Sequence, residues 1–274
     1  MTGKRKYKKT FRTKKRKSIF RIFKNRFFWL SILILLVLGA VLYFFFFSSF
    51  FQIKQVEISG NKKVPTEDIK NIVSEQANKK IFFLDSRNIF LINFKETNQK
   101  LLEKFPQIEE VNLKRKFPDT VETNIKERIP IGIWCQVDRC FCFDKKGVVF
   151  EEGKKEAELI IKPENEEAEI FLGKEVLEER KIEEILKIQK SLEEQVDIRI
   201  KELVVSLDGE KLIVKTEDAW EIYFSLGENV SDQLFNLDLV LKEKIPLERR
   251  KGLEYIDLRF ENRVYFKYRE STSD

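Results

Sequence analysis

The chain of 274 residues contains no histidine, a single methionine, three cysteines and ten glycines. The absence of histidine excludes Ser-His-Asp and Cys-His catalysis, histidine-ligated zinc and imidazole acid–base chemistry. The few glycines form neither a GxGxxG nor a GxxxxGK[ST] pattern, which excludes these phosphate-binding loops. Most common enzyme chemistries are therefore excluded, and we expect no metal, no cofactor and no small-molecule substrate.

Acidic residues are absent from the beginning of the chain. Residues 1–26 hold 13 lysines and arginines, and the first acid is Glu57, whereas the remainder of the chain is more acidic than basic. A basic segment of this kind is typical of nucleic-acid binding, of contact with an anionic membrane surface, or of a signal for membrane topology.

The residues that follow favour the topology signal. From Phe27 to Phe47 the only clearly polar residue is Ser31, and a helix of this length spans about 31 Å, close to a hydrocarbon core of roughly 30 Å. A cleaved signal peptide would have a shorter apolar region and a small-residue site, but this segment ends in four phenylalanines. We predict a single-pass anchor over residues 27–50, with residues 1–26 in the cytoplasm and the rest of the chain outside the membrane. Nucleic-acid binding is not expected.

Residues 51–128 show a β-α-α-β-β order. A strand begins near residue 51 and closes at Gly60, and Pro65 followed by acidic residues starts a helix. A second helix is expected at about 93–104, followed by strands at 108–116 and 120–127. This order buries one sheet face beneath two helices, and we expect the remaining surface to be mainly charged.

The second region, residues 129–268, has a different pattern, and a polar tail of residues 269–274 follows it. Short strands are expected around residues 131–151 and 159–161, then a helix at about 174–195, three alternating strands between 198 and 225, and a helix at about 231–244. Strands at 255–260 and 264–268 end the region. Asp257 and Arg259 share a strand face, which predicts a surface or cross-strand ion pair. The whole chain is thus predicted to be α+β, with a transmembrane helix, a β-α-α-β-β domain and a mainly antiparallel β domain with helices.

Several short segments of the chain match a known family. The most specific is Tyr255-Ile256-Asp257-Leu258-Arg259-Phe260 near the end of the chain. The other supporting segments are Val56-Glu57-Ile58-Ser59-Gly60-Asn61, Lys104-Phe105-Pro106-Gln107-Ile108, Phe117-Pro118-Asp119-Thr120-Val121, Glu127-Arg128-Ile129-Pro130 and Phe143-Asp144 through Gly147-Val148-Val149-Phe150. With these segments the chain resembles the FtsQ/DivIB family of bacterial cell-division proteins, which carry a POTRA domain directly after a single membrane span.

The resemblance implies a non-catalytic scaffold at the division septum. Such a protein would link early and late septal proteins, bind FtsB- and FtsL-like bitopic partners outside the plasma membrane, and contact other divisome components through its POTRA domain. The alternative is a membrane-tethered cell-envelope enzyme or binding protein that carries a POTRA module. Its candidate acids, Glu151-Glu152 and Glu166-Glu167, lie in polar stretches without an apolar pocket pattern, and acid–base catalysis needs burial or a close partner.

The last strand is the candidate partner-binding site. No later strand covers it, so its free N–H and C=O groups can add a strand from another chain, although the basic residues Arg263, Lys267 and Arg269 could blunt the edge. Family members bind FtsB at their last strands, and we expect Phe260 and Tyr265 to be aromatic anchors. The resemblance therefore implies a site made of Phe260, Arg263, Val264, Tyr265, Phe266 and Lys267.

The three cysteines lie in the segment expected outside the membrane, where disulfides form. If residues 136–139 form a four-residue hairpin loop, Cys135 and Cys140 lie opposite each other at a distance that a disulfide can bridge. We predict this disulfide and a free, buried Cys142. Three cysteines without histidine fall short of a zinc site.

Overall fold

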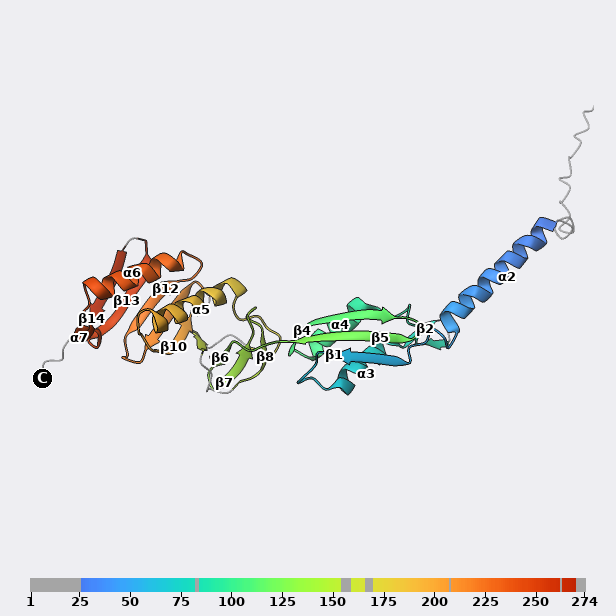
Figure 1. Ribbon diagram of the computed structural model, residues 1–274, viewed down its shortest axis with the longest axis horizontal. Helices are drawn as coiled ribbons and strands as arrows, with labels where there is room; N and C mark the ends of the chain where they lie inside the picture. Colours follow the sequence, from blue (N-terminus) through green and yellow to red (C-terminus); the bar gives the residue numbers. More distant parts are fainter. Residues whose placement is uncertain are drawn as a thin grey trace, which may run out of the picture.

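The computed structural model describes residues 26–81, 84–153, 159–165, 170–206, 208–261 and 263–269. Figure 1 shows three parts in a row: the long helix α2, a small α/β unit, and a larger sheet with helices at the C-terminal end. The predicted α+β class is confirmed. Residues 1–25 of the basic segment, Glu166-Glu167 and residues 270–274 of the tail lie outside the described residues.

Helix α2 (Arg26–Phe47) is apolar on all sides. It has 22 residues and buries none of them in the protein, and its length of about 33 Å matches the thickness of a bilayer core. A helix that is apolar all round and uncovered by protein is consistent with a single membrane span.

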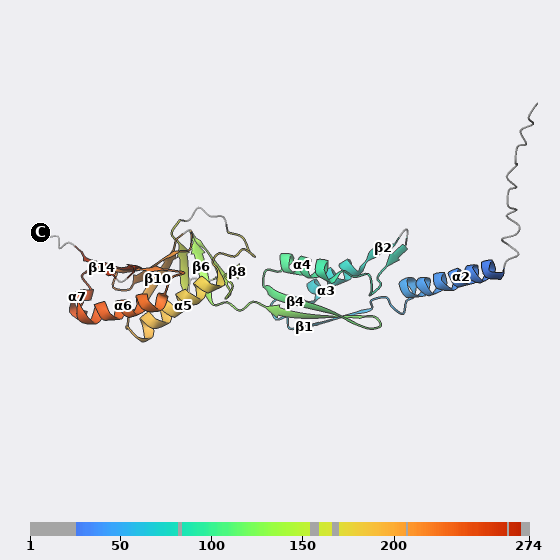
Figure 2. The same cartoon turned by 90° about the horizontal axis from the view of Figure 1, so that it is seen from above.

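The unit that follows contains the predicted β-α-α-β-β order with one addition. Its three-stranded sheet has the order β1-β5-β4, with β1 parallel to β5, and α3 and α4 cover one face (Figure 2). A short hairpin, β2–β3, is inserted between the helices and was not predicted. The elements are β1 (Gln55–Ser59), α3 (Thr66–Ala77), β2 (Lys79–Ile81), β3 (Leu84–Ser86), α4 (Phe94–Lys104), β4 (Ile108–Lys116) and β5 (Thr120–Glu127).

The C-terminal unit is built on one nine-stranded sheet of order β14-β13-β12-β11-β10-β9-β6-β7-β8. Five neighbouring pairs are antiparallel, and the pairs β6–β9, β9–β10 and β12–β13 are parallel. The elements are β6 (Gly132–Gln136), β7 (Arg139–Phe143), β8 (Val149–Glu152), β9 (Ile160–Pro163), α5 (Glu179–Glu194), β10 (Ile200–Val205), β11 (Lys211–Thr216), β12 (Glu221–Ser225), α6 (Val230–Glu243), α7 (Leu247–Arg250), β13 (Leu253–Phe260) and β14 (Arg263–Tyr268).

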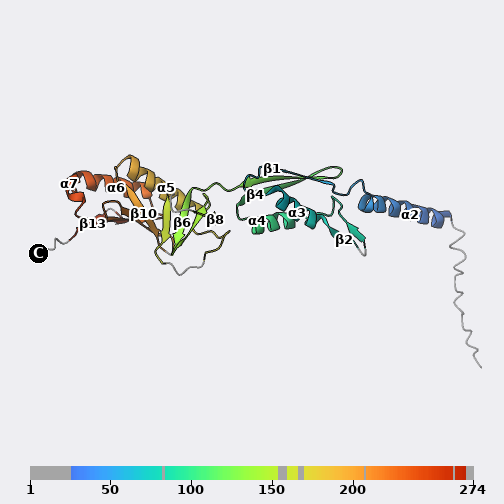
Figure 3. The same ribbon diagram turned by 90° about the horizontal axis from the view of Figure 1, so that it is seen from below.

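Helices α5 and α6 lie on one face of this sheet, as Figure 3 shows from below. The core between them includes Trp220, Phe224, Ile185 and Leu237, all almost fully buried. Burial of such large side chains contributes roughly 1.5–3 kcal/mol each, so this layer holds the helices in place. Over the opposite sheet face, the described residues place no helix.

Helix α5 begins later than predicted. The expected start was near residue 174, but the helix begins at Glu179. The preceding residues pair with the β7–β8 turn instead: Val149 N donates to Lys174 O at 2.9 Å and Val176 N donates to Gly147 O at 2.9 Å. Tertiary hydrogen bonding has replaced the first helical turn that the sequence pattern indicated.

The two units meet at the end of β5, where Glu127 and Arg128 lie. The Glu127 carboxylate accepts hydrogen bonds from three backbone amides, those of residues 62–64, at 2.7–3.0 Å. Arg128 donates to Pro106 O at 3.0 Å and to Asp144 Oδ2 at 2.5 Å. Both side chains of the Arg128–Asp144 pair are largely buried. The Arg128 guanidinium therefore connects the two units through a buried ion pair.

Candidate partner-binding edge

Strand β14 is a free edge of the nine-stranded sheet. It pairs on one side with β13, and none of the described residues pairs with its other side. Arg269 N donates to Gly252 O at 2.9 Å, so this amide points toward β13. Alternation in an antiparallel pair then directs the amides of Val264, Phe266 and Tyr268 toward the open side.

The two faces of β14 differ in their surroundings. Val264 and Tyr268 pack against the core beneath the sheet, and Phe266, which shares their face, is 38% exposed. Tyr265 and Lys267 point to the uncovered face. One face therefore holds the strand in the domain and the other remains open, as its alternating pattern predicts.

The predicted aromatic anchors lie together at the β13–β14 turn. Phe260 and Tyr265 are 50% and 47% exposed, and their ring centroids lie 5.1 Å apart in an edge-to-face arrangement. Exposed aromatic pairs of this geometry bury a large apolar area when a partner covers them. The structure thus brings these two residues together beside the open edge.

Charged residues flank the edge but do not block it. Lys267 Nζ lies 2.8 Å from Glu254 Oε2, and the Arg269 guanidinium donates to Ala219 O. Arg263 is exposed at the start of the strand. The contacts of Lys267 and Arg269 within the domain hold these two cations away from the open side of β14. The backbone groups on that side of the strand therefore remain accessible.

An aromatic and charged cluster on the uncovered face extends the site and was missed in the sequence. The rings of Tyr223 and Tyr255 stack at 5.5 Å, and the Arg259 guanidinium lies 5.3 Å from the Tyr223 ring centre. Burial, together with the Tyr223 hydroxyl's hydrogen bond to Glu221, raises the pKa of Tyr223, so its hydroxyl stays a donor. The spacing of Tyr255, Asp257 and Arg259 by two residues places them on one face of β13 and could have indicated part of the cluster, but Tyr223 comes from another strand.

Asp257 and Arg259 form an ion pair, but it is neither exposed on both sides nor cross-strand. Arg259 Nη2 and Nε lie 2.6 and 2.8 Å from the two oxygens of Asp257, which is only 6% exposed. The hydrogen bond to this carboxylate outweighs partial burial and raises the pKa of Arg259. The pair fixes the guanidinium over Tyr223 rather than acting as a solvated surface contact.

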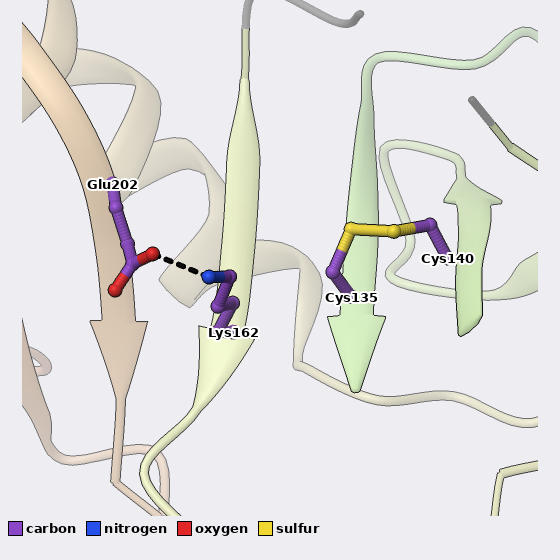
Figure 4. The surroundings of a disulfide bond; sticks show 4 residues. All are labelled: Cys135, Cys140, Lys162 and Glu202. Carbon is purple, nitrogen blue, oxygen red and sulfur yellow. Dashed lines mark hydrogen bonds and ion pairs between the residues drawn. A yellow bond between two sulfur atoms is a disulfide. The ribbon is translucent and has the colours of Figure 1, made fainter. Parts of the chain in front are cut away.

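The cysteines lie at the other end of the sheet. Cys135 and Cys140 are direct neighbours on β6 and β7 and form a disulfide (Figure 4). The strands extend further than predicted, so the turn has two residues, Val137 and Asp138, rather than four. Cys142 is free and half-buried rather than buried, and burial and the Glu151 carboxylate raise the pKa of its thiol.

Of the candidate acids of the enzyme alternative, the structure describes Glu151 and Glu152, and each lies beside a cation. Glu151 is paired with Lys63 at 2.6 Å, and Glu152 is exposed beside Arg139 at 3.5 Å. Among the residues that the structure describes, no group of three His, Cys, Asp or Glu side chains is placed to hold a metal ion. Lys162 and Glu202, on β9 and β10 beside the disulfide (Figure 4), form an ion pair between neighbouring strands, which stabilises the sheet.

The sequence model of the family described as "POTRA domain, FtsQ-type" matches residues 51–128. This span contains all elements from β1 to β5 and less than a third of the chain. No match to the chain was found among curated proteins. Residues 51–128 therefore belong to the FtsQ-type POTRA domain family and follow an apolar helix suited to anchoring them in a membrane.

Proposed function

We propose that this chain is a non-catalytic divisome scaffold of the FtsQ/DivIB type that binds an FtsB/FtsL-like bitopic partner through β14. The FtsQ-type POTRA domain supports a role in the division apparatus. The observation that carries the partner site is the open edge of β14 beside the Phe260–Tyr265 pair. A partner segment would add a tenth strand to the sheet by backbone pairing, and the aromatic pair would select its side chains.

In this proposal, α2 anchors the protein in the plasma membrane. In the proposed topology, the basic N-terminal segment is cytoplasmic and the POTRA and β domains are outside, because positively charged flanks remain on the cytoplasmic side. The POTRA domain would contact further divisome components close to the septal membrane, while β14 lies at the far end of the molecule.

Backbone pairing can be separated from side-chain contact at a single position. The substitution Phe266→Pro removes an amide on the open side of β14, whereas Phe266→Ala removes the same side chain and keeps the amide. We expect full-length protein with Phe266→Pro to lose binding of an FtsB-like peptide, and Phe266→Ala to retain most of it. Equal binding by both variants, each with a wild-type unfolding midpoint, would contradict strand addition.

The side-chain contribution is tested at the aromatic pair. Phe260→Ala and Tyr265→Ala should each weaken peptide binding by about 2 kcal/mol if they are hot spots. An exposed aromatic residue on the helical side, Phe235, supplies the control: Phe235→Ala should leave binding unchanged. Calorimetric titration of the four proteins decides this.

Depletion of the protein in its host separates the scaffold from the enzyme alternative. A divisome scaffold predicts filamentous cells with failed septa. Normal division combined with altered cell-wall chemistry would contradict the proposal and favour a membrane-tethered envelope enzyme or binding protein.

A further inference from the structure

A connected cluster of phenylalanines lies where α2 meets the POTRA domain, and we name it the aromatic bridge. Neighbouring rings have centroids 5.0–6.3 Å apart, from the last turn of α2 to the turn between β4 and β5. The aromatic bridge consists of Phe44, Phe45, Phe50, Phe51, Phe90 and Phe117.

Much of the aromatic bridge is uncovered by protein. Phe90 and Phe117, which belong to the POTRA domain, are 41% and 58% exposed, and Phe50 in the linker is 54% exposed. The expectation of a mainly charged POTRA surface is therefore wrong at this end. A contiguous exposed apolar patch of this kind marks a surface that another apolar phase covers.

The POTRA domain is fastened to the end of α2 by hydrogen bonds. Ser86 Oγ donates to Phe46 O at 3.0 Å, and Asn88 Nδ2 donates to Phe45 O at 2.6 Å and to Phe46 O at 3.2 Å. Ser86 and Asn88 are buried, and they satisfy helix carbonyls that would otherwise lack partners. The height of Phe90 and Phe117 relative to the end of the helix is thereby fixed.

That height corresponds to the surface of a bilayer. If the apolar residues of α2 fill a hydrocarbon core of roughly 30 Å, the helix end at Phe47 lies at the outer boundary, and the rings of the aromatic bridge lie in the interfacial layer. Aromatic side chains are enriched in this layer. Arg87 at the same end is exposed and is suited to a phosphate head group, whereas the exposed Lys54 and Lys116 are ion-paired with Asp119 and Glu57.

We propose that the aromatic bridge inserts into the outer interfacial layer of the membrane and docks the POTRA domain on the lipid surface. The continuity of the rings with lipid-facing residues of α2 identifies lipid, rather than a partner protein, as what covers them. This inference rests on α2 spanning the membrane and not on a role in division. Its consequence is that the POTRA domain has a set orientation on the bilayer instead of swinging on its linker.

Depth-dependent fluorescence quenching tests the proposal on the full chain. Single copies would be placed in nanodiscs of phosphatidylcholine and phosphatidylglycerol, with bromine atoms near the top of the acyl chains. In a Trp29→Phe background, Phe117→Trp or Phe90→Trp adds a reporter at the aromatic bridge. The emission of the buried Trp134 and Trp220, measured in the Trp29→Phe background alone, is subtracted. Phe235→Trp adds a reporter on α6 in the other domain, at a position that is 67% exposed before substitution.

We expect the Phe117→Trp and Phe90→Trp reporters to lose emission in brominated nanodiscs and to resist aqueous iodide, and the Phe235→Trp reporter to show the reverse. Quenching of the Phe117→Trp and Phe90→Trp reporters no stronger than at Phe235→Trp would overturn the proposal. Shielding from both quenchers would overturn it as well, because a protein surface would then cover the rings. The emission of Trp29, taken as the difference between the parent chain and the Trp29→Phe background, checks whether α2 lies in the bilayer. If lipid quenches Trp29 but neither reporter, the docking proposal fails and the membrane anchor stands. If lipid does not quench Trp29, both the docking proposal and the anchor fail.

Discussion

Removal of the Glu127 side chain should destabilise the POTRA domain at the end that meets the β domain. Its carboxylate accepts the amides of Lys62, Lys63 and Val64 at 2.7–3.0 Å, in the loop between β1 and α3. In Glu127→Ala, the exposed amides of Lys62 and Lys63 can bind water, but the amide of the buried Val64 is poorly placed to do so. We therefore expect the free energy of unfolding to fall by about 1–3 kcal/mol rather than by three full hydrogen bonds.

Such a loss is a large fraction of a typical domain stability of about 5–15 kcal/mol. The measurement is denaturant unfolding of the full chain in detergent micelles, combined with hydrogen exchange of the peptide that contains Val64. Glu127→Gln retains an acceptor and should lose less than Glu127→Ala. Glu103→Ala removes an exposed carboxylate on α4 and serves as the control. The reasoning fails if Glu127→Ala and Glu103→Ala unfold at the same midpoint.

The same carboxylate gives the stability a pH dependence. Burial raises the pKa of Glu127, but its backbone hydrogen bonds and Lys63 more than offset this, so the pKa in the folded protein lies below its ordinary value. The stabilisation is therefore complete above the unfolded pKa of roughly 4.3 and is lost as the pH falls through the lower folded pKa. Over that acidic range the stability of Glu127→Ala should depend less on pH than that of wild type.

Two further predictions concern the β domain. Protein that is denatured but not reduced should show one reactive thiol, that of Cys142. The same protein should show three reactive thiols after the Cys135–Cys140 disulfide is reduced. Three reactive thiols before reduction would contradict the disulfide. Replacement of Arg128 by methionine leaves the buried Asp144 carboxylate without its cation. The free energy of unfolding, measured with denaturant, should therefore fall by about 3 kcal/mol. An unchanged unfolding midpoint would contradict a role for the pair in stability.

The POTRA domain was predictable because its signals are local. Pro65 and the acids after it indicated the start of α3, which begins at Thr66, and Phe117-Pro118-Asp119 indicated the turn between β4 and β5. Helix starts and turns depend on residues within a few positions of each other. The bounds inferred from the sequence therefore agree with the structure to within a residue or two for the start of α3 and for the whole of α4, β4 and β5.

Features built from distant residues were not predictable in this way. The parallel pairing of β9 with β6 and β10, and the late start of α5, arise from contacts between segments far apart in the chain. The aromatic bridge is a similar case. Phe51, Phe90 and Phe117 belong to three separate segments of the sequence, and only the fold brings their rings into contact.

The segment Glu127-Arg128-Ile129-Pro130 shows how a family motif acquires physical meaning from the structure. In the sequence it marks a boundary and nothing indicates why acid and base should be adjacent. In the structure Glu127 binds backbone amides of the loop after β1, more than sixty residues earlier, while Arg128 reaches forward to Asp144 in the next domain. Neighbouring strand residues point to opposite sides, so one acid and one base in succession can secure the POTRA loop and the β domain at once. The motif therefore sets the geometry between the membrane-proximal domain and the edge strand proposed to bind the partner.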